Sequence, residues 1–168
     1  MHRAPALGVR AGIVFLAALA MSLPIPLLPA MPDLMVIAVA VIALIKGPWV
    51  GAMVGLSGGW LIDLVPPGAS PMGASALLYA ALGAGVGAAR RHLAATPTAG
   101  LLPLIPWAVV ALASAVVLAV RATSAAAGFG DADLSAIGWT WLLTVALTPV
   151  LLPALVWLER MLAVRRWG

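Results

Sequence analysis

The sequence predicts an all-α integral membrane protein that forms a single domain over residues 1–168. Hydrophobic residues make up 64% of the 168 residues and charged residues only 8%, and the mean hydropathy is +1.16. A water-soluble domain of this size needs far more polar surface than this composition supplies. Because each membrane crossing takes about 20 apolar residues, six crossings would use most of the chain and leave only short loops.

Six apolar runs, each bounded by charge or by proline and glycine, are the predicted transmembrane helices. They cover approximately residues 11–30, 31–45, 48–65, 71–89, 101–120 and 137–158. The continuous apolar part of the second run, Leu34–Ile45, makes only about 18 Å of helix, whereas the hydrocarbon core is about 30 Å thick. A re-entrant segment is therefore an alternative to a crossing. Asp33 is expected to cap the start of this helix.

The basic residues predict the orientation of the six spans. If the second run crosses, eight of the nine lysines and arginines lie on the side of the N-terminus, and only Arg121 lies opposite. If it does not cross, the best division is six to three. The positive-inside rule therefore favours six crossings with both termini in the cytoplasm. Residues 121–136 are expected to form the longest outer loop. Alternatively, the first run is a signal peptide that is cleaved near Ala18–Ala20.

Glycines recur every four residues along the third run, at Gly47, Gly51, Gly55 and Gly59. The fourth run carries small residues at the same spacing, namely Ala76, Ala80, Ala84 and Ala88, with Gly83 and Gly87 one position earlier. Lipid gives helices no hydrophobic reason to associate, so close approach through small residues must supply the packing. The two stripes are predicted to pack helices of this chain together, and a surface for a partner's helix is the alternative.

Asp63 is the one carboxylate inside an apolar run. Ionisable groups in a membrane are costly and are commonly functional. Pro66 and Pro67 end the helix just after Asp63, which places the carboxylate within about one turn of the outer interface, where the cost is smaller. Two roles stay open for Asp63: a structural hydrogen bond at the interface, or a contact with a ligand or partner.

Prolines and tryptophans mark several of the predicted spans. Prolines in three of the apolar runs are expected to interrupt the hydrogen-bond ladder of their helices, as tolerated kinks or, alternatively, to form a cavity or hinge; they are Pro24, Pro26, Pro29, Pro103, Pro106, Pro149 and Pro153. Four tryptophans near predicted helix ends are expected to anchor the protein at the membrane interfaces; they are Trp107, Trp139, Trp157 and Trp167.

The sequence lacks the groups that catalysis would require. It has no cysteine. Ser57 lies in a glycine-rich stretch similar to serine-nucleophile motifs, but the two histidines, His2 and His92, lie at the N-terminus and in a predicted cytoplasmic loop, too far away to serve as a base. The scattered basic residues form no nucleic-acid-binding face. We therefore expect no enzymatic activity, no cofactor, no metal and no nucleic-acid partner.

Several short motifs follow one another in a fixed order between residues 32 and 91. They are Pro32-Asp33-Leu34, Lys46-Gly47-Pro48 with Gly51, Gly55-x-x-Gly58-Gly59, Asp63-Leu64-x-Pro66-Pro67, Pro71-x-Gly73 and Arg90-Arg91. Together with the chain length, the six runs and the short loops, these motifs resemble the bacterial rod-shape-determining family MreD. They cover a little over a third of the chain. The chain departs from the family pattern at Leu56, where an aromatic residue is common, and at Ala84-Gly85, where a Gly-Tyr pair is common.

The resemblance implies a multi-pass subunit of the bacterial cytoplasmic membrane that binds the bitopic protein MreC and contacts membrane lipids. In that family the complex links MreB filaments, indirectly, to the peptidoglycan polymerase RodA and its transpeptidase. The positions that match the family motifs and could serve it are Asp33, Asp63, Pro66, Pro67, Pro71 and Gly73, beside the glycines of the two stripes.

The same resemblance supplies an alternative function. The MreD family resembles, in fold, the substrate-binding subunits of energy-coupling-factor vitamin transporters. A vitamin site needs convergent polar groups, and the predicted spans offer few of them: Ser57, Ser75, Tyr79, Ser114, Thr140, Thr144 and Thr148.

The predicted topology can be tested with single cysteines, because the natural chain has none. In intact cells, a membrane-impermeant thiol reagent should label Asp131→Cys, whereas His92→Cys should react only after permeabilisation. Equal labelling of both variants in intact cells would contradict the six-span topology.

Overall fold

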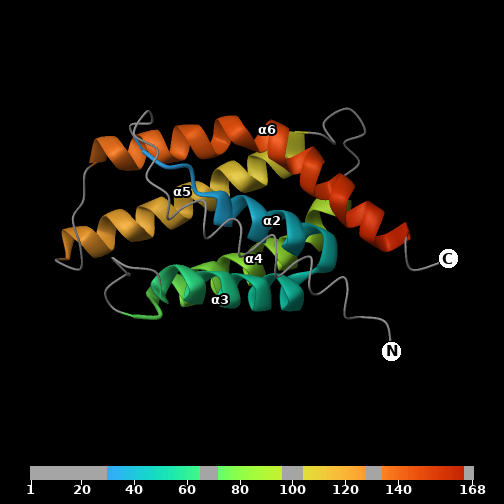
Figure 1. Cartoon of the computed structure of the whole chain (residues 1–168), viewed down its shortest axis with the longest axis horizontal. Coiled ribbons are helices and arrows are strands. Elements are labelled where there is room, and N and C mark those ends of the chain that lie inside the picture. Colours follow the sequence, from blue (N-terminus) through green and yellow to red (C-terminus); the bar gives the residue numbers. More distant parts are fainter. Residues whose placement is uncertain (1–29, 65–71, 96–103, 128–133, 165–168) are drawn as a thin grey trace.

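The computed structural model describes residues 30–64, 72–95, 104–127 and 134–164, and all regular structure in these ranges is helical. Five helices follow one another, α2 (Leu34–Lys46), α3 (Pro48–Leu64), α4 (Ala74–Ala95), α5 (Leu104–Ala126) and α6 (Leu134–Val164). Successive helices alternate in direction, so the starts of α2, α4 and α6 lie at the same end of the bundle as the ends of α3 and α5 (Figure 1). The predicted run 11–30 lies outside the described residues.

The all-α prediction is confirmed for the described residues. Two segments are long and apolar enough to cross a membrane, Ile105–Ala126 in α5 and Ser135–Trp157 in α6. The helices Leu34–Lys46 and Ala74–Arg90 are apolar but shorter.

The predicted outer loop 121–136 is wrong in extent. α5 continues to Ala126 and α6 already begins at Leu134. The charge of Arg121 suggested the end of a span, but the structure places this residue inside α5, where its guanidinium donates a hydrogen bond to the hydroxyl of Tyr79. Because the charge is bonded within the bundle, the helix does not have to end before it.

α2 is the central helix of the bundle. Nine consecutive residues, Met35–Ala43, are buried, and a helix that is apolar on every side belongs in an interior. It packs against α3, α4, α5 and α6. At the C-terminal end of α2, Arg90 donates a hydrogen bond of 3.0 Å to the carbonyl oxygen of Ile45. This bond satisfies one of the carbonyls that have no partner within the helix.

α3 and α4 make the most extensive contact between any two helices, and glycine makes it sterically feasible. A Cβ atom added at Gly51 would lie 2.6 Å from the carbonyl oxygen of Gly83. One added at Gly59 would lie 2.5 Å from the Cα atom of Ala76, and one added at Gly55 would overlap the backbone of Tyr79. The two backbones therefore touch along the whole stripe.

The contacting row on α4 differs from the predicted alanine series. It runs through Ala76, Tyr79, Gly83 and Gly87. Gly87 meets the backbone of Pro48 at the start of α3. Ala76 belongs to this row and the backbone nitrogen of Ala80 lies close to it. Ala84 and Ala88 fall beside the row because the helix repeat of 3.6 residues alternates steps of three and four along one face.

The prolines interrupt the backbone hydrogen bonds of α6 but not those of α5. Pro149 and Pro153 lie inside α6, which changes direction along its length (Figure 1). Pro149 cannot donate to the carbonyl of Val145, and the indole nitrogen of Trp107 donates to that oxygen at 3.2 Å instead. Pro106 lies in the first turn of α5, where amides have no acceptor within the helix. The prediction that Pro106 interrupts its helix is therefore wrong. Pro24, Pro26, Pro29 and Pro103 lie outside the described residues.

The glycine contact predicts opposite outcomes for two neighbouring positions of α4. Gly83→Ala places its Cβ against the backbone of Gly51 and should destabilise the protein by about 1–3 kcal/mol. Gly85→Ala meets nothing within 4 Å and should be neutral or stabilise by about 0.5–1 kcal/mol through helix propensity. Unfolding in a mixed-micelle denaturant titration measures both. Equal stabilities of the two variants would contradict the close helix contact.

Candidate functional site

Asp33 is the centre of a buried hydrogen-bond network at the end of the bundle where α2 begins. Its side chain is 1% exposed. One carboxylate oxygen, Oδ1, accepts from the backbone amide of Val36 at 3.1 Å and caps α2, as the sequence predicts. The other, Oδ2, accepts from the hydroxyl of Tyr79 at 2.6 Å. Both carboxylate oxygens of Asp33 are therefore bonded.

Arg121 completes the electrostatic part of the network. Its Nη2 atom donates to the hydroxyl oxygen of Tyr79 at 2.7 Å and lies 3.8 Å from Oδ2 of Asp33. The guanidinium carbon lies 5.8 Å from the centre of the Tyr79 ring, within the range of a cation–π contact. The Tyr79 hydroxyl therefore bridges Asp33 and Arg121: it donates to the buried carboxylate and accepts from the half-buried guanidinium.

Threonines of α6 bring the last helix into the same network. The backbone amide of Asp33 donates to Oγ1 of Thr144 at 2.7 Å. The Thr144 hydroxyl in turn donates to the carbonyl oxygen of Thr140 at 2.6 Å, and Thr148 donates to the carbonyl of Thr144 at 2.8 Å. Residues of α4, α5 and α6 are thereby joined to the start of α2.

Sequence reasoning gave these polar residues separate roles and did not bring them together. Tyr79 and the threonines were candidates for a ligand cavity, and Arg121 served only to predict orientation. The spacing of Thr140, Thr144 and Thr148, four residues apart, is the one signal that could have placed them together on a polar face of α6. Their partner cannot be identified from the sequence, because the bond between Asp33 and Thr144 spans 111 residues.

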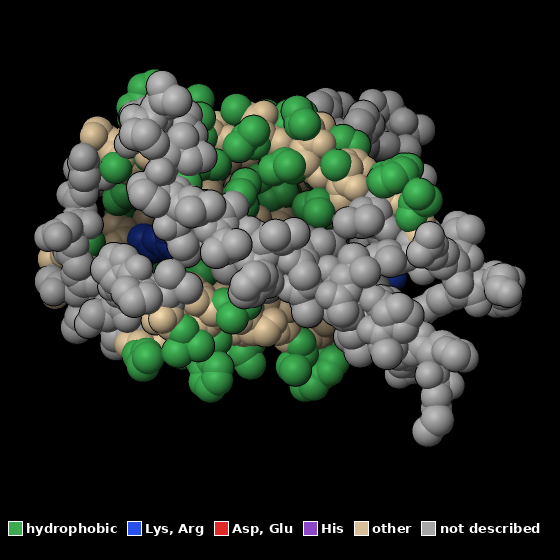
Figure 2. Space-filling model, viewed as in Figure 1, with side chains coloured by type: hydrophobic (Ala, Val, Ile, Leu, Met, Phe, Trp, Pro, Cys, Tyr) green, Lys and Arg blue, Asp and Glu red, His purple; other side chains and the backbone are tan. Residues whose placement is uncertain are grey.

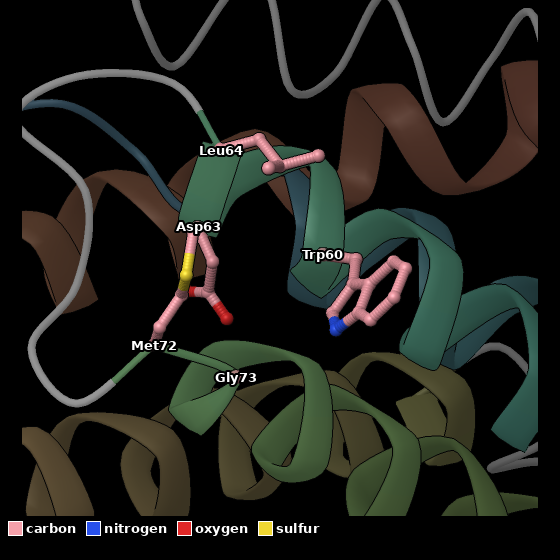
Figure 3. A pocket seen from close by; sticks show the side chains of 5 residues that line it. All are labelled: Trp60, Asp63, Leu64, Met72 and Gly73. Atoms are coloured by element: carbon pink, nitrogen blue, oxygen red, sulfur yellow. The ribbon is translucent and has the colours of Figure 1, made fainter.

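Asp63 lies at the same end of the bundle, at the last turn of α3. It is 5% exposed, and its Oδ2 atom accepts from the backbone amide of Ala76 at 3.3 Å, which caps α4. It also lines a pocket of about 350 Å³ with Trp60, Leu64, Met72 and Gly73. Figure 3 shows the Asp63 carboxylate and the Trp60 indole nitrogen directed toward the same space between α3 and the start of α4.

The other predicted site residues fall into three groups. Gly51, Gly55, Gly59, Gly83 and Gly87 come together in the contact between α3 and α4. Gly47 and Gly73 precede α3 and α4 with φ angles of 96° and 92°, a left-handed conformation that favours glycine. Pro66, Pro67 and Pro71 lie outside the described residues.

The face of α3 opposite the glycines is apolar and exposed along its length. We call these residues the α3 stripe; they are Trp49, Met53, Leu56, Trp60 and Leu64, with exposed fractions from 40% to 78%. They are three or four residues apart, as neighbours on one helical face are. In the space-filling view hydrophobic side chains line the edge of the molecule over α3 (Figure 2).

A second apolar feature is a groove of about 480 Å³ between α4 and α5. Its lining is hydrophobic or glycine throughout; it includes Leu78, Leu82, Val86, Val109, Leu112 and Val116. Such a groove offers no hydrogen bond to orient a polar ligand.

No protein-family model, no curated protein and no solved structure matches this chain. Its function is therefore inferred from the geometry above and from the sequence motifs.

Removing the hydroxyl of Tyr79 tests the buried network. Tyr79→Phe deprives Oδ2 of Asp33 of its donor and Arg121 of its acceptor, so it should destabilise the protein by about 2 kcal/mol. Ser57→Ala is the control, because the Ser57 hydroxyl is exposed and bonds only the carbonyl of Val54 in its own helix. If denaturant unfolding gives both variants the stability of the parent, the network does not stabilise the bundle.

Proposed function

We propose that this protein is a non-enzymatic, six-span subunit of the bacterial cell-elongation complex, with both termini on the cytoplasmic side of the inner membrane. It binds a bitopic membrane protein of the MreC type and, through it, supports lateral peptidoglycan synthesis by RodA and its transpeptidase. MreB filaments are linked to it indirectly. The motifs between residues 32 and 91 suggest this family, and the structure supplies the physical support described below.

The distribution of charge over the bundle supports the proposed orientation. Lys46 and Arg90 lie where α2 ends and α4 approaches its end, and Arg121 lies toward the opposite end, beside Asp33. Among the described residues, a basic cytoplasmic end and one half-buried arginine at the other end agree with the positive-inside rule. The run 11–30 supplies the sixth crossing in this proposal.

The main support for the proposal is the difference between the two faces of α3. One face is fixed to α4 by direct backbone contact at glycines, so the helix position is defined without large side chains. The other face, the α3 stripe, is rich in tryptophan and methionine, which are enriched at protein interfaces. A rigid helix with an exposed apolar stripe suits the docking of a single transmembrane helix, and this is how we propose that the partner is held.

The polar side chains of the bundle support assembly over vitamin binding. Tyr79, Thr144 and Thr148 are fully buried. The hydroxyl of Tyr79 bonds Asp33 and Arg121, that of Thr144 bonds the Asp33 amide and its own helix, and that of Thr148 bonds its own helix. Ser114 donates to the carbonyl of Ala111 in its own helix. In the described residues these hydroxyls are therefore bonded within or between the helices of the bundle, whereas a vitamin site would need them directed into a cavity.

Truncating the α3 stripe should weaken the proposed partner contact. The double variant Met53→Ala with Leu56→Ala removes apolar volume from the stripe and should lower recovery of an MreC-like protein on native purification by about tenfold. The matched control is Leu142→Ala with Met161→Ala, which truncates the same residue types at exposed positions of α6.

Recovery is quantified at equal levels of the membrane protein, with cell shape scored in parallel. Equal loss in both double variants, or in neither, would contradict the assignment of the stripe as the partner surface. Co-purification of an ATPase module in place of an MreC-like protein would contradict the elongation function and favour the transporter alternative.

A further inference from the structure

Asp63 holds the one buried side-chain polar atom of the described residues that lacks a hydrogen-bond partner, its Oδ1 oxygen. The other oxygen, Oδ2, caps α4 through Ala76. Because the side chain is only 5% exposed, water cannot freely solvate the unbonded oxygen, and leaving it unbonded is costly. By contrast, both carboxylate oxygens of Asp33 are bonded. A donor from outside the described residues is therefore expected at Oδ1.

The pocket beside Asp63 offers both a hydrogen-bond acceptor and a donor. Trp60 and Asp63 are three residues apart and share one face of α3. The carboxylate of Asp63 and the indole nitrogen of Trp60 face the same space (Figure 3). A carboxylate selects a positively charged donor, and an indole N–H selects an acceptor such as a phosphate oxygen. The pair is therefore complementary to a molecule that carries both charges.

The rim of the pocket indicates that this molecule also has an apolar part. Trp60, Leu64 and Met72 line the pocket and are 62%, 61% and 76% exposed. The pocket lies where α3 ends and α4 begins, the level at which the proposed topology places the outer membrane interface. A headgroup in the pocket would thus have its acyl chains next to apolar side chains.

We propose that this pocket binds the headgroup of phosphatidylethanolamine, with its ammonium donating to Oδ1 of Asp63 and its phosphate accepting from the indole N–H of Trp60. Choline cannot take this place, because its quaternary nitrogen has no N–H to donate. Phosphatidylglycerol has no cation for the carboxylate. A metal ion would need more ligands, and the described residues contain no group of three acidic or histidine side chains that could hold one. The inference goes beyond the proposed function and rests on the membrane topology proposed there.

Lipid selectivity of the purified full-length protein tests the proposal. The protein is delipidated in detergent and titrated with phosphatidylethanolamine, phosphatidylcholine or phosphatidylglycerol of equal chain length, and binding is read by native mass spectrometry. Phosphatidylethanolamine can donate a charge-assisted hydrogen bond to Asp63 and phosphatidylcholine cannot. The parent should therefore bind phosphatidylethanolamine about tenfold more tightly than phosphatidylcholine. Asp63→Asn keeps an oxygen to cap α4 but loses the charge, and should abolish this preference.

A second pair of variants separates recognition from folding. Trp60→Phe removes the indole N–H and part of the exposed ring, and should weaken phosphatidylethanolamine binding about threefold. Trp49→Phe makes the same change near the other end of the helix and should leave the binding unchanged. Equal affinity of the parent for phosphatidylethanolamine and phosphatidylcholine would overturn the proposal. So would an intact preference in a folded Asp63→Asn variant.

A third outcome would also overturn it: no lipid preference, together with loss of a co-purifying protein in Asp63→Asn, would assign Oδ1 to a basic side chain of a partner. Because the titration contains no partner protein, its result is independent of the α3 stripe experiment.

Discussion

The carboxylate of Asp33 is the constraint on which the arrangement of the helices depends. It is buried at the start of the most enclosed helix, and a buried anion must find donors within the protein. Those donors come from the first turn of α2 and from Tyr79 of α4, which is itself bonded to Arg121 of α5. The Asp33 amide reaches Thr144 of α6. The hydrogen bonds around Asp33 thereby fix the positions of α2, α4, α5 and α6 at one end of the bundle.

α3 supplies none of these groups and is held by a different interaction. Its glycines allow backbone contact with α4 over several turns, where dispersion and weak Cα–H contacts accumulate at a short distance between the helices. The two mechanisms meet at Tyr79: its hydroxyl bonds Asp33, and its backbone carbonyl lies against Gly55. The polar network and the steric contact therefore set the same register of α4, and neither leaves α4 free to slide.

Local signals in the sequence predicted the helices, the cap at Asp33 and the small-residue stripe, because each depends on spacing within one helix. The end of α5 was missed because the charge of Arg121 looks like a boundary until its partner is known. Likewise, Trp107 looked only like an interfacial anchor, yet its indole bonds the carbonyl of Val145 that Pro149 leaves free. Partners that lie many residues apart in the chain carry no local pattern, and so the network and the pocket at Asp63 emerge only from the fold.

The two buried aspartates show how structural and binding roles can be told apart in an apolar bundle. Each caps a helix, α2 or α4, with one oxygen. For Asp33 the second oxygen is bonded by Tyr79, so nothing about it requires a further molecule. For Asp63 the second oxygen is buried and unbonded among the described residues, and the residue lines a pocket with an exposed apolar rim. A cap needs only one carboxylate oxygen, and asparagine or serine would supply it. Capping α4 therefore does not require a carboxylate at position 63, whereas the cationic headgroup proposed for the pocket does.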